Sequence, residues 1–222
     1  MGHKNLMLVE GRNDQYVLRG LLQHHHIDCT ILGRPNREYG ADAIIIDQKN
    51  SVQGVLDTLK VILDDGDLER LAVIVDADHD IKARWDALKN ILAHFGGQDI
   101  PGVPIPEGAV ITLVQHFRTL RVGVWLMPNN RVPGILEDFI RFLVPDEQET
   151  LWQYAIDCVN NIPEKPLFPD IALPKAKIHT WLAWQKQPGQ PLGIAITAKY
   201  LNADASDASN LINWVKQVFE LS

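Results

Sequence analysis

Short apolar runs alternate with amphipathic helical patterns over the first two-fifths of the chain, and this alternation limits the folds that are open to it. Residues 71–75 (Leu-Ala-Val-Ile-Val) are apolar without a break, as in a strand that is buried on both faces. Residues 52–63 before this run, and 81–95 after it, repeat apolar side chains at helical spacing. Strands that alternate with helices predict an α/β fold with a parallel sheet and helical crossovers.

The same patterns place the other elements. Further strands are expected at 5–9, 27–32, 43–46, 110–114 and 122–126. Helix N-caps are expected at Asn13, Ser51 and Asp80.

The pattern becomes mainly helical after Pro128, where Asp146 and Glu149 have the spacing of a capping box. We therefore predict an α/β domain over residues 1–143 and a helical extension over residues 144–222 that packs on it.

Composition and charge exclude several classes of protein. The 222 residues include 21 Lys or Arg and 28 Asp or Glu, a formal net charge of −7, which argues against a protein that coats duplex nucleic acid through phosphate contacts. No apolar run approaches the ~20 residues of a membrane helix, and residues 1–5 lack the apolar stretch of a secretory signal. We expect a cytoplasmic protein without membrane association, in which Cys29 and Cys158 are reduced structural residues.

Three carboxylates lie at the carboxyl ends of expected strands. Glu10 follows the strand at 5–9, while Asp76 and Asp78 follow the strand at 71–75. Parallel sheets place their ligand crevices at the carboxyl ends of strands, and residues i and i+2 of a strand point to the same side. We therefore expect these acids to converge on a hard cation. Oxygen ligands without cysteine favour Mg²⁺, Mn²⁺ or Ca²⁺ over zinc.

The motifs that carry these acids resemble the Toprim domain of topoisomerases, bacterial primases, recombination-repair proteins and overcoming-lysogenization-defect nucleases. Residues 8–14 (Leu-Val-Glu-Gly-Arg-Asn-Asp) are similar to that family's strand ending in Glu-Gly, and residues 75–80 (Val-Asp-Ala-Asp-His-Asp) to its later strand ending in Asp-x-Asp. The resemblance covers roughly residues 5–140. It implies a mostly parallel Toprim-like sheet, magnesium at the acids, and Glu10 as general acid or base in making or breaking phosphodiester bonds.

The resemblance to the nuclease branch adds two acids. Asp14 matches an acidic residue four positions after the glutamate, and Glu137 lies in a Gly-x-x-Glu element at 134–137. These residues are therefore candidates for a second metal ion, ~4 Å from the first in two-metal phosphoryl transfer. The late lysine that some of these nucleases use is not assigned. The lysines of that region are Lys175, Lys177 and Lys199.

Each acid also has a purely structural interpretation. Glu10 and Asp14 lie where a helix begins, and a negative charge there is favoured by ~0.3–1 kcal/mol. Asp76 and Asp78 could form an ordinary strand-to-helix turn, and Glu137 could favour the start of a helix.

The polar residues nearest the expected crevice are candidates for contact with a phosphate. They are Arg12, His79 and Lys82, with a solvated surface as the alternative. The run His24-His25-His26 is interpreted as a solvated helix end, because adjacent residues of a helix point in different directions.

Two functions follow from these features. The first is a magnesium-dependent enzyme, with manganese as an alternative ion, that acts on phosphodiester bonds of DNA or RNA as a nuclease. The second is a catalytically idle Toprim-like module that binds a metal, a nucleotide or a protein partner in a regulatory or defence role, alone or as an oligomer. A third option, a phosphatase or nucleotide hydrolase of another α/β type, is disfavoured because the chain lacks a Walker glycine loop and an Asp-x-Asp-x-Thr nucleophile pattern.

Overall fold

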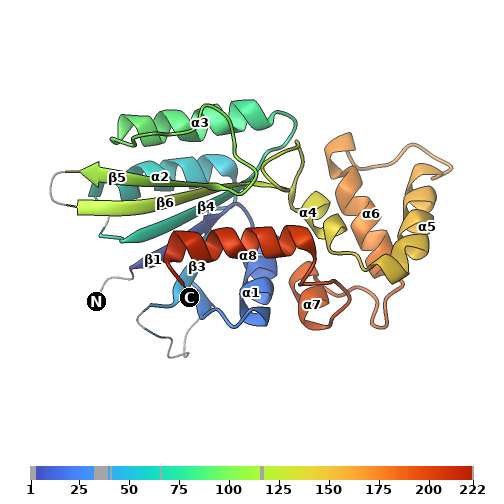
Figure 1. Cartoon of the computed structure of the whole chain (residues 1–222). Coiled ribbons are helices and arrows are strands. Elements are labelled where there is room, and N and C mark those ends of the chain that lie inside the picture. The colour runs from blue at the N-terminus through green and yellow to red at the C-terminus, as the bar shows by residue number, and fades with distance from the viewer. Residues whose placement is uncertain (1–3, 33–39, 41, 66, 116–117, 222) are drawn as a thin grey trace.

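A six-stranded sheet forms the centre of the computed structural model (Figure 1), which describes all residues except 1–3, 33–39, 41, 66, 116–117 and 222. The strands are β1 (Asn5–Val9), β2 (Cys29–Ile31), β3 (Ile44–Gln48), β4 (Arg70–Asp76), β5 (Ala109–Gln115) and β6 (Arg118–Met127). They follow the order β2-β3-β1-β4-β6-β5, and only β5 runs antiparallel to its neighbour. The predicted α/β fold with a mostly parallel sheet is therefore confirmed.

Alternate residues of the central strands enter two separate hydrophobic clusters, one on each face of the sheet. Met7 and Val9 pack in one cluster, and Leu8 packs in the other. The first cluster is covered by α1 (Arg12–His24) and α8 (Ser206–Phe219), and the second by α2 (Val52–Asp65) and α3 (Ile81–His94), as Figure 1 shows. Burial on both faces explains why the central strands are uninterrupted apolar runs.

The C-terminal part is helical and continues the first of these clusters. It comprises α4 (Leu136–Phe142), α5 (Glu149–Asn160), α6 (Leu173–Leu182), α7 (Leu192–Thr197) and α8. Helices α4, α5 and α6 lie beyond the edge at which the parallel strands end, while α7 packs against α1 and α8 against β4 and β6 (Figure 1). The hydrophobic contacts therefore run across residue 143, and the boundary placed there stays a prediction.

Two helix caps are confirmed and two other expected helix starts are wrong. The Ser51 hydroxyl accepts the backbone N–H of Gly54 at 3.1 Å, and the Asp80 carboxylate accepts that of Ala83 at 2.9 Å. Helix α1 instead starts one residue before the expected cap Asn13, because the backbone N–H of Gly11 bonds to the carboxylate of Asp14 and Gly11 occupies the cap position.

The second wrong start is that of α5. Residues Asp146–Gln148 form a 3-10 turn before the helix, so the expected capping box does not form.

None of the helices that the structure describes is both long enough and apolar enough to cross a membrane.

We expect Gly123→Ala to lower the free energy of unfolding by ~1–3 kcal/mol, because an added Cβ in β6 would lie 2.2 Å from Cγ2 of Val218 and 2.8 Å from Cζ2 of Trp214 on α8. Urea unfolding followed by circular dichroism measures this loss. Gly102→Ala is the matched control, because nothing lies within 4 Å of its added Cβ. Equal midpoints for the two variants would contradict the tight contact between α8 and β6.

Candidate metal centre

Glu10 joins the ends of two neighbouring strands. It follows β1, and its Oε1 atom accepts the backbone N–H of Asp76, at the end of β4, at 2.8 Å. Burial raises the pKa of the Glu10 carboxyl, and the hydrogen bond from the Asp76 amide partly opposes this effect. The expected proximity of Glu10 and Asp76 is therefore present in the fold.

Asp14 is a buried acid in the first turn of α1. Its Oδ2 atom accepts the backbone N–H of Gly11 at 3.2 Å, and its Oδ1 atom is buried with no hydrogen-bond partner among the described residues. Burial is the largest cause that raises the pKa of Asp14 to about 7, and the neighbouring carboxylates of Glu10 and Glu137 act in the same direction. A helix-capping role alone leaves half of this carboxylate unsatisfied.

Asp76 has the most perturbed environment of the group. Its Oδ1 atom is also buried without a hydrogen-bond partner in the described part of the chain. Burial is the largest cause that raises the pKa of Asp76 to about 9, followed by the charges of Asp14, Glu10 and Glu137. The charges of Asp14, Glu10 and Glu137 therefore act together on Asp76.

Glu137 enters this group from α4. Its side chain is buried, and Oε1 lies 3.4 Å from Nζ of Lys175 on α6. A cavity of about 270 Å³ is lined by Asp14, Asp76, Glu137 and Lys175 together with residues that begin α1 and α4. We call the four carboxylates of Glu10, Asp14, Asp76 and Glu137 the acid pocket.

A hard divalent cation would fit the chemistry of the acid pocket. Unpaired carboxylate oxygens in a buried site are costly, and a cation would satisfy both orphaned atoms and offset the mutual repulsion. No three of these acids, among the described residues, already hold ligand atoms within 4.8 Å of one another. Ion binding would therefore require the carboxylates to rotate towards a common point.

Asp78 lies differently from the expectation. Strand β4 ends at Asp76, and Asp78 has a φ of 53°, so the two residues do not share one face of a continuing strand as expected. The Asp78 carboxylate pairs with the guanidinium of Arg84, which also donates to the Asp76 carbonyl oxygen at 2.9 Å. The predicted same-face geometry is wrong, while a metal-binding role for Asp78 stays a prediction.

The three expected phosphate contacts have separate surroundings. Arg12 lines the same cavity as the acids. His79 is exposed and lines a different cavity of about 200 Å³, beside Asp78. Lys82 lies 2.5 Å from the carboxylate of Asp86 one turn along α3, the arrangement of a solvated helix face. Contact of any of these residues with a substrate stays a prediction.

Lys175 is the one cation of the cavity that the sequence did not assign. It lies on α6, a helix that packs against α4, the helix of Glu137. The only sequence signal is that Lys175 is one of three lysines in the region where a late lysine is expected.

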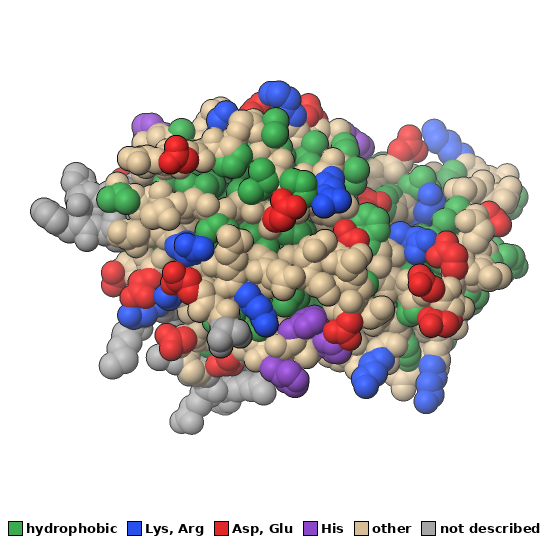
Figure 2. All heavy atoms as spheres, in the orientation of Figure 1, with side chains coloured by type: hydrophobic (Ala, Val, Ile, Leu, Met, Phe, Trp, Pro, Cys, Tyr) green, Lys and Arg blue, Asp and Glu red, His purple; other side chains and the backbone are tan. Residues whose placement is uncertain are grey.

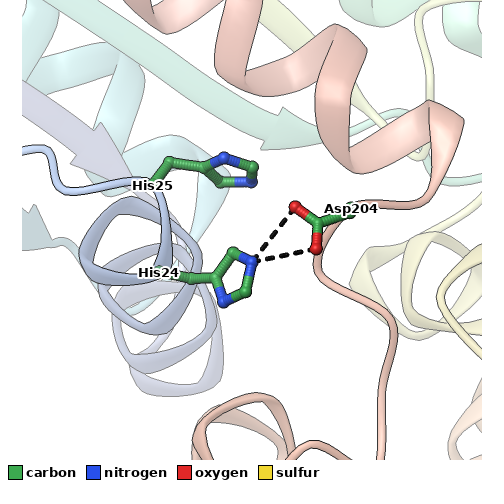
Figure 3. Close-up of side chains that lie close together, drawn as sticks. All are labelled: His24, His25 and Asp204. Carbon is green, nitrogen blue, oxygen red and sulfur yellow. Dashed lines mark hydrogen bonds and ion pairs between the residues drawn. The ribbon is translucent and has the colours of Figure 1, made fainter.

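The histidine run makes contacts that the sequence does not predict. Nε2 of His24 lies 3.1 Å from both carboxylate oxygens of Asp204, and Nε2 of His25 lies 3.0 Å from the Ala203 carbonyl oxygen (Figure 3). His24 is the last residue of α1, and His25 is its C-cap. The exposed helix end is as expected, but it is paired with a distant segment.

Comparison with known proteins identifies one family. A family model described as "Protein of unknown function (DUF3226)" matches residues 4–220, which include both the sheet and the C-terminal helices. No curated protein and no solved structure matches the chain.

We expect Asp76→Asn to remove a pH-dependent destabilisation of the metal-free protein. A pKa raised from 3.8 to about 9 means that the folded state holds a proton that the unfolded state has lost. The contribution of Asp76 to stability is therefore complete below pH 4 and falls as the pH rises towards 9. Urea unfolding in a chelator at pH 5, 7 and 8.5 measures this effect. The free energy of unfolding of Asp76→Asn, relative to that of the wild type, should increase at each step in pH.

Asp64→Asn is the control for this experiment, because Asp64 is exposed on α2 and does not line the cavity of the acid pocket. Parallel pH profiles of the wild type and Asp76→Asn would contradict the burial of Asp76 as a neutral acid.

Proposed function

This chain belongs to the DUF3226 family, and we propose that it is a magnesium-dependent nuclease, with manganese as an alternative ion, that acts on DNA or RNA. The observation that carries the proposal is the pair of buried, unpartnered oxygens of Asp14 and Asp76, beside Glu10 and Glu137. Groups of like charge are retained in such a setting where a cation binds. The resemblance to Toprim nucleases gives this cation a role in phosphodiester chemistry.

In this proposal the four acids of the acid pocket have different roles. Asp76 and Asp14 each have a free oxygen for an ion, and Glu137 would extend the ligand set towards a second ion. Glu10 would act as general acid or base. Its Oε1 atom is held by the Asp76 amide, and burial raises its pKa towards the pH at which proton transfer is efficient.

Lys175 would supply positive charge beside the reacting phosphate. Its side chain is half exposed, its Nζ atom lies 3.4 Å from Oε1 of Glu137, and it lines the same cavity. Developing negative charge on a phosphate oxygen would be stabilised by such a fixed cation.

A second cavity extends the site along α1 and offers a path for the substrate. It has a volume of about 510 Å³, lies between α1 and α7, and shares Arg12 and Asn13 with the acid pocket's cavity. We call it the α1–α7 groove. Its lining is as follows: Arg12, Asn13, Tyr16, Arg19, Gly20, Gln23, Pro191, Gly193, Ile194 and Thr197.

The charge of the α1–α7 groove suits a nucleic-acid strand. None of its lining residues is acidic, and within the described part of the chain neither Arg12 nor Arg19 forms a salt bridge. The Arg12 guanidinium lies 5.7 Å from the centre of the Tyr16 ring. Arginines beside an aromatic ring are typical of grooves that bind single strands by phosphate contact and base stacking.

The alternative function is a catalytically idle module that binds a metal ion, a nucleotide or a protein partner. It is favoured by the spacing of the acids, because among the described residues no three of them have ligand atoms within 4.8 Å of one another. The net charge of −7, which disfavours binding to nucleic acid, also favours it. The two functions differ in whether bound magnesium leads to cleavage.

We expect Glu10→Gln and Asp76→Asn to lose at least about 100-fold of a magnesium-dependent cleavage rate, because one variant removes the proton-transfer group and the other an ion ligand. Labelled single- and double-stranded DNA and RNA, incubated with Mg²⁺ or Mn²⁺, provide the measurement. Asp64→Asn should cleave like the wild type.

Equal cleavage by the wild type and both acid-pocket variants would remove this site from the mechanism. Magnesium binding that Asp76→Asn abolishes, without cleavage of any substrate, would select the idle module.

We expect Arg19→Glu to weaken binding of a single-stranded oligonucleotide about 10-fold, because it reverses a charge in the α1–α7 groove. Fluorescence anisotropy in a chelator measures this binding without cleavage. Lys186→Glu is the matched control, since it makes the same change of charge at an exposed position outside that groove. An equal loss of oligonucleotide affinity in both variants would mean that only net charge matters, and would contradict a binding role for the groove.

A further inference from the structure

Two histidines and an aspartate meet where the end of α1 approaches the segment before α8. His24 and Asp204 are 180 positions apart in the sequence, yet Nε2 of His24 lies 3.1 Å from the carboxylate. Figure 3 shows both imidazole rings beside the Asp204 side chain, and Figure 2 shows histidines gathered next to acidic side chains on this face. The fold therefore brings together groups that no local motif contains.

The donor set suits a transition-metal ion. One ligand atom from each of His24, His25 and Asp204 lies within 4.8 Å of the other two, and among the described residues this is the only group with that property. Zinc binds imidazole nitrogen at ~2.0–2.1 Å and carboxylate oxygen at ~2.0–2.2 Å, so these donors need only a small inward movement. Imidazole ligands favour zinc, copper or nickel, whereas magnesium prefers oxygen ligands alone.

The end of the helix adds to the attraction for a cation. His24 ends α1 and His25 caps it, so the ion would lie near the negative end of the helix dipole. The usual objection, that adjacent histidines of a helix point apart, does not hold here because His25 has left the helix. To bind, its Nε2 atom would exchange the hydrogen bond to the Ala203 carbonyl oxygen for the metal.

We propose that His24, His25 and Asp204 form a zinc-binding site that links the end of α1 to the segment between α7 and α8. The site is separate from the acid pocket and does not rest on the proposed nuclease function. Side chains of His24 and Asp204 that are 38% and 69% exposed leave room for water or a further ligand to complete the coordination. A zinc ion bound there would hold these two segments together and so stabilise the fold.

Zinc titration of the full chain, without a histidine affinity tag and after treatment with a chelator, tests the proposal. A chromophoric chelator as competitor reports the affinity, and Co²⁺ as a probe reports the coordination geometry by visible absorption. We expect His24→Ala and Asp204→Asn to bind zinc at least about 10-fold more weakly than the wild type. Zinc should also raise the melting temperature of the wild type more than that of either variant.

His26→Asn is the control, because it removes the neighbouring histidine of the run while asparagine tolerates the φ of 58° at that position. Any zinc bound by the acid pocket contributes equally to all of these proteins, so the comparison of His24→Ala with His26→Asn isolates the site. Equal zinc affinity and equal thermal shifts for those two variants, or no zinc binding by the wild type, would overturn the proposal.

Discussion

The parallel pairing of β1 with β4 is the constraint on which the candidate metal centre depends. Their register pairs Val9 with Ile74, so β4 extends two residues past the end of β1, and Glu10, which follows β1, reaches the backbone N–H of Asp76. Helix α1 starts at once after β1, which places Asp14 in the same space. Glu137 enters the same cavity from α4, and the charges of Asp14, Glu10 and Glu137 add to burial in raising the pKa of Asp76.

Much of this arrangement could be predicted from the sequence, because its causes are local. Continuous apolar runs predict strands buried on two faces, and the carboxyl ends of parallel strands meet at one edge. These two rules suffice to bring Glu10 near Asp76. The position of Asp14 follows from the first turn of the helix, where its carboxylate lies near the strand end that precedes it.

Other parts of the site depend on features that a sequence pattern does not contain. Asp78 left the expected face because β4 ends at Asp76 and the guanidinium of Arg84 holds the following turn. Lys175 reaches Glu137 through the packing of α6 on α4, and His24 reaches Asp204 through the path of the chain around α7. Contacts of this kind arise from helix packing, for which side-chain periodicity gives the buried face but not the partner.

The contact between α1 and α7 has a consequence for how the adjoining groove can vary. A Cβ added to Gly20 would lie 3.2 Å from the backbone oxygen of Gly193, and one added to Gly193 would lie 2.7 Å from the backbone of Tyr16. The spacing of the two helices is therefore set by main chain against main chain. Other side chains that line the α1–α7 groove can therefore be exchanged without changing the distance between the two helices. Relatives that keep both glycines would have a groove of the same width, while its chemical character could differ from one relative to the next.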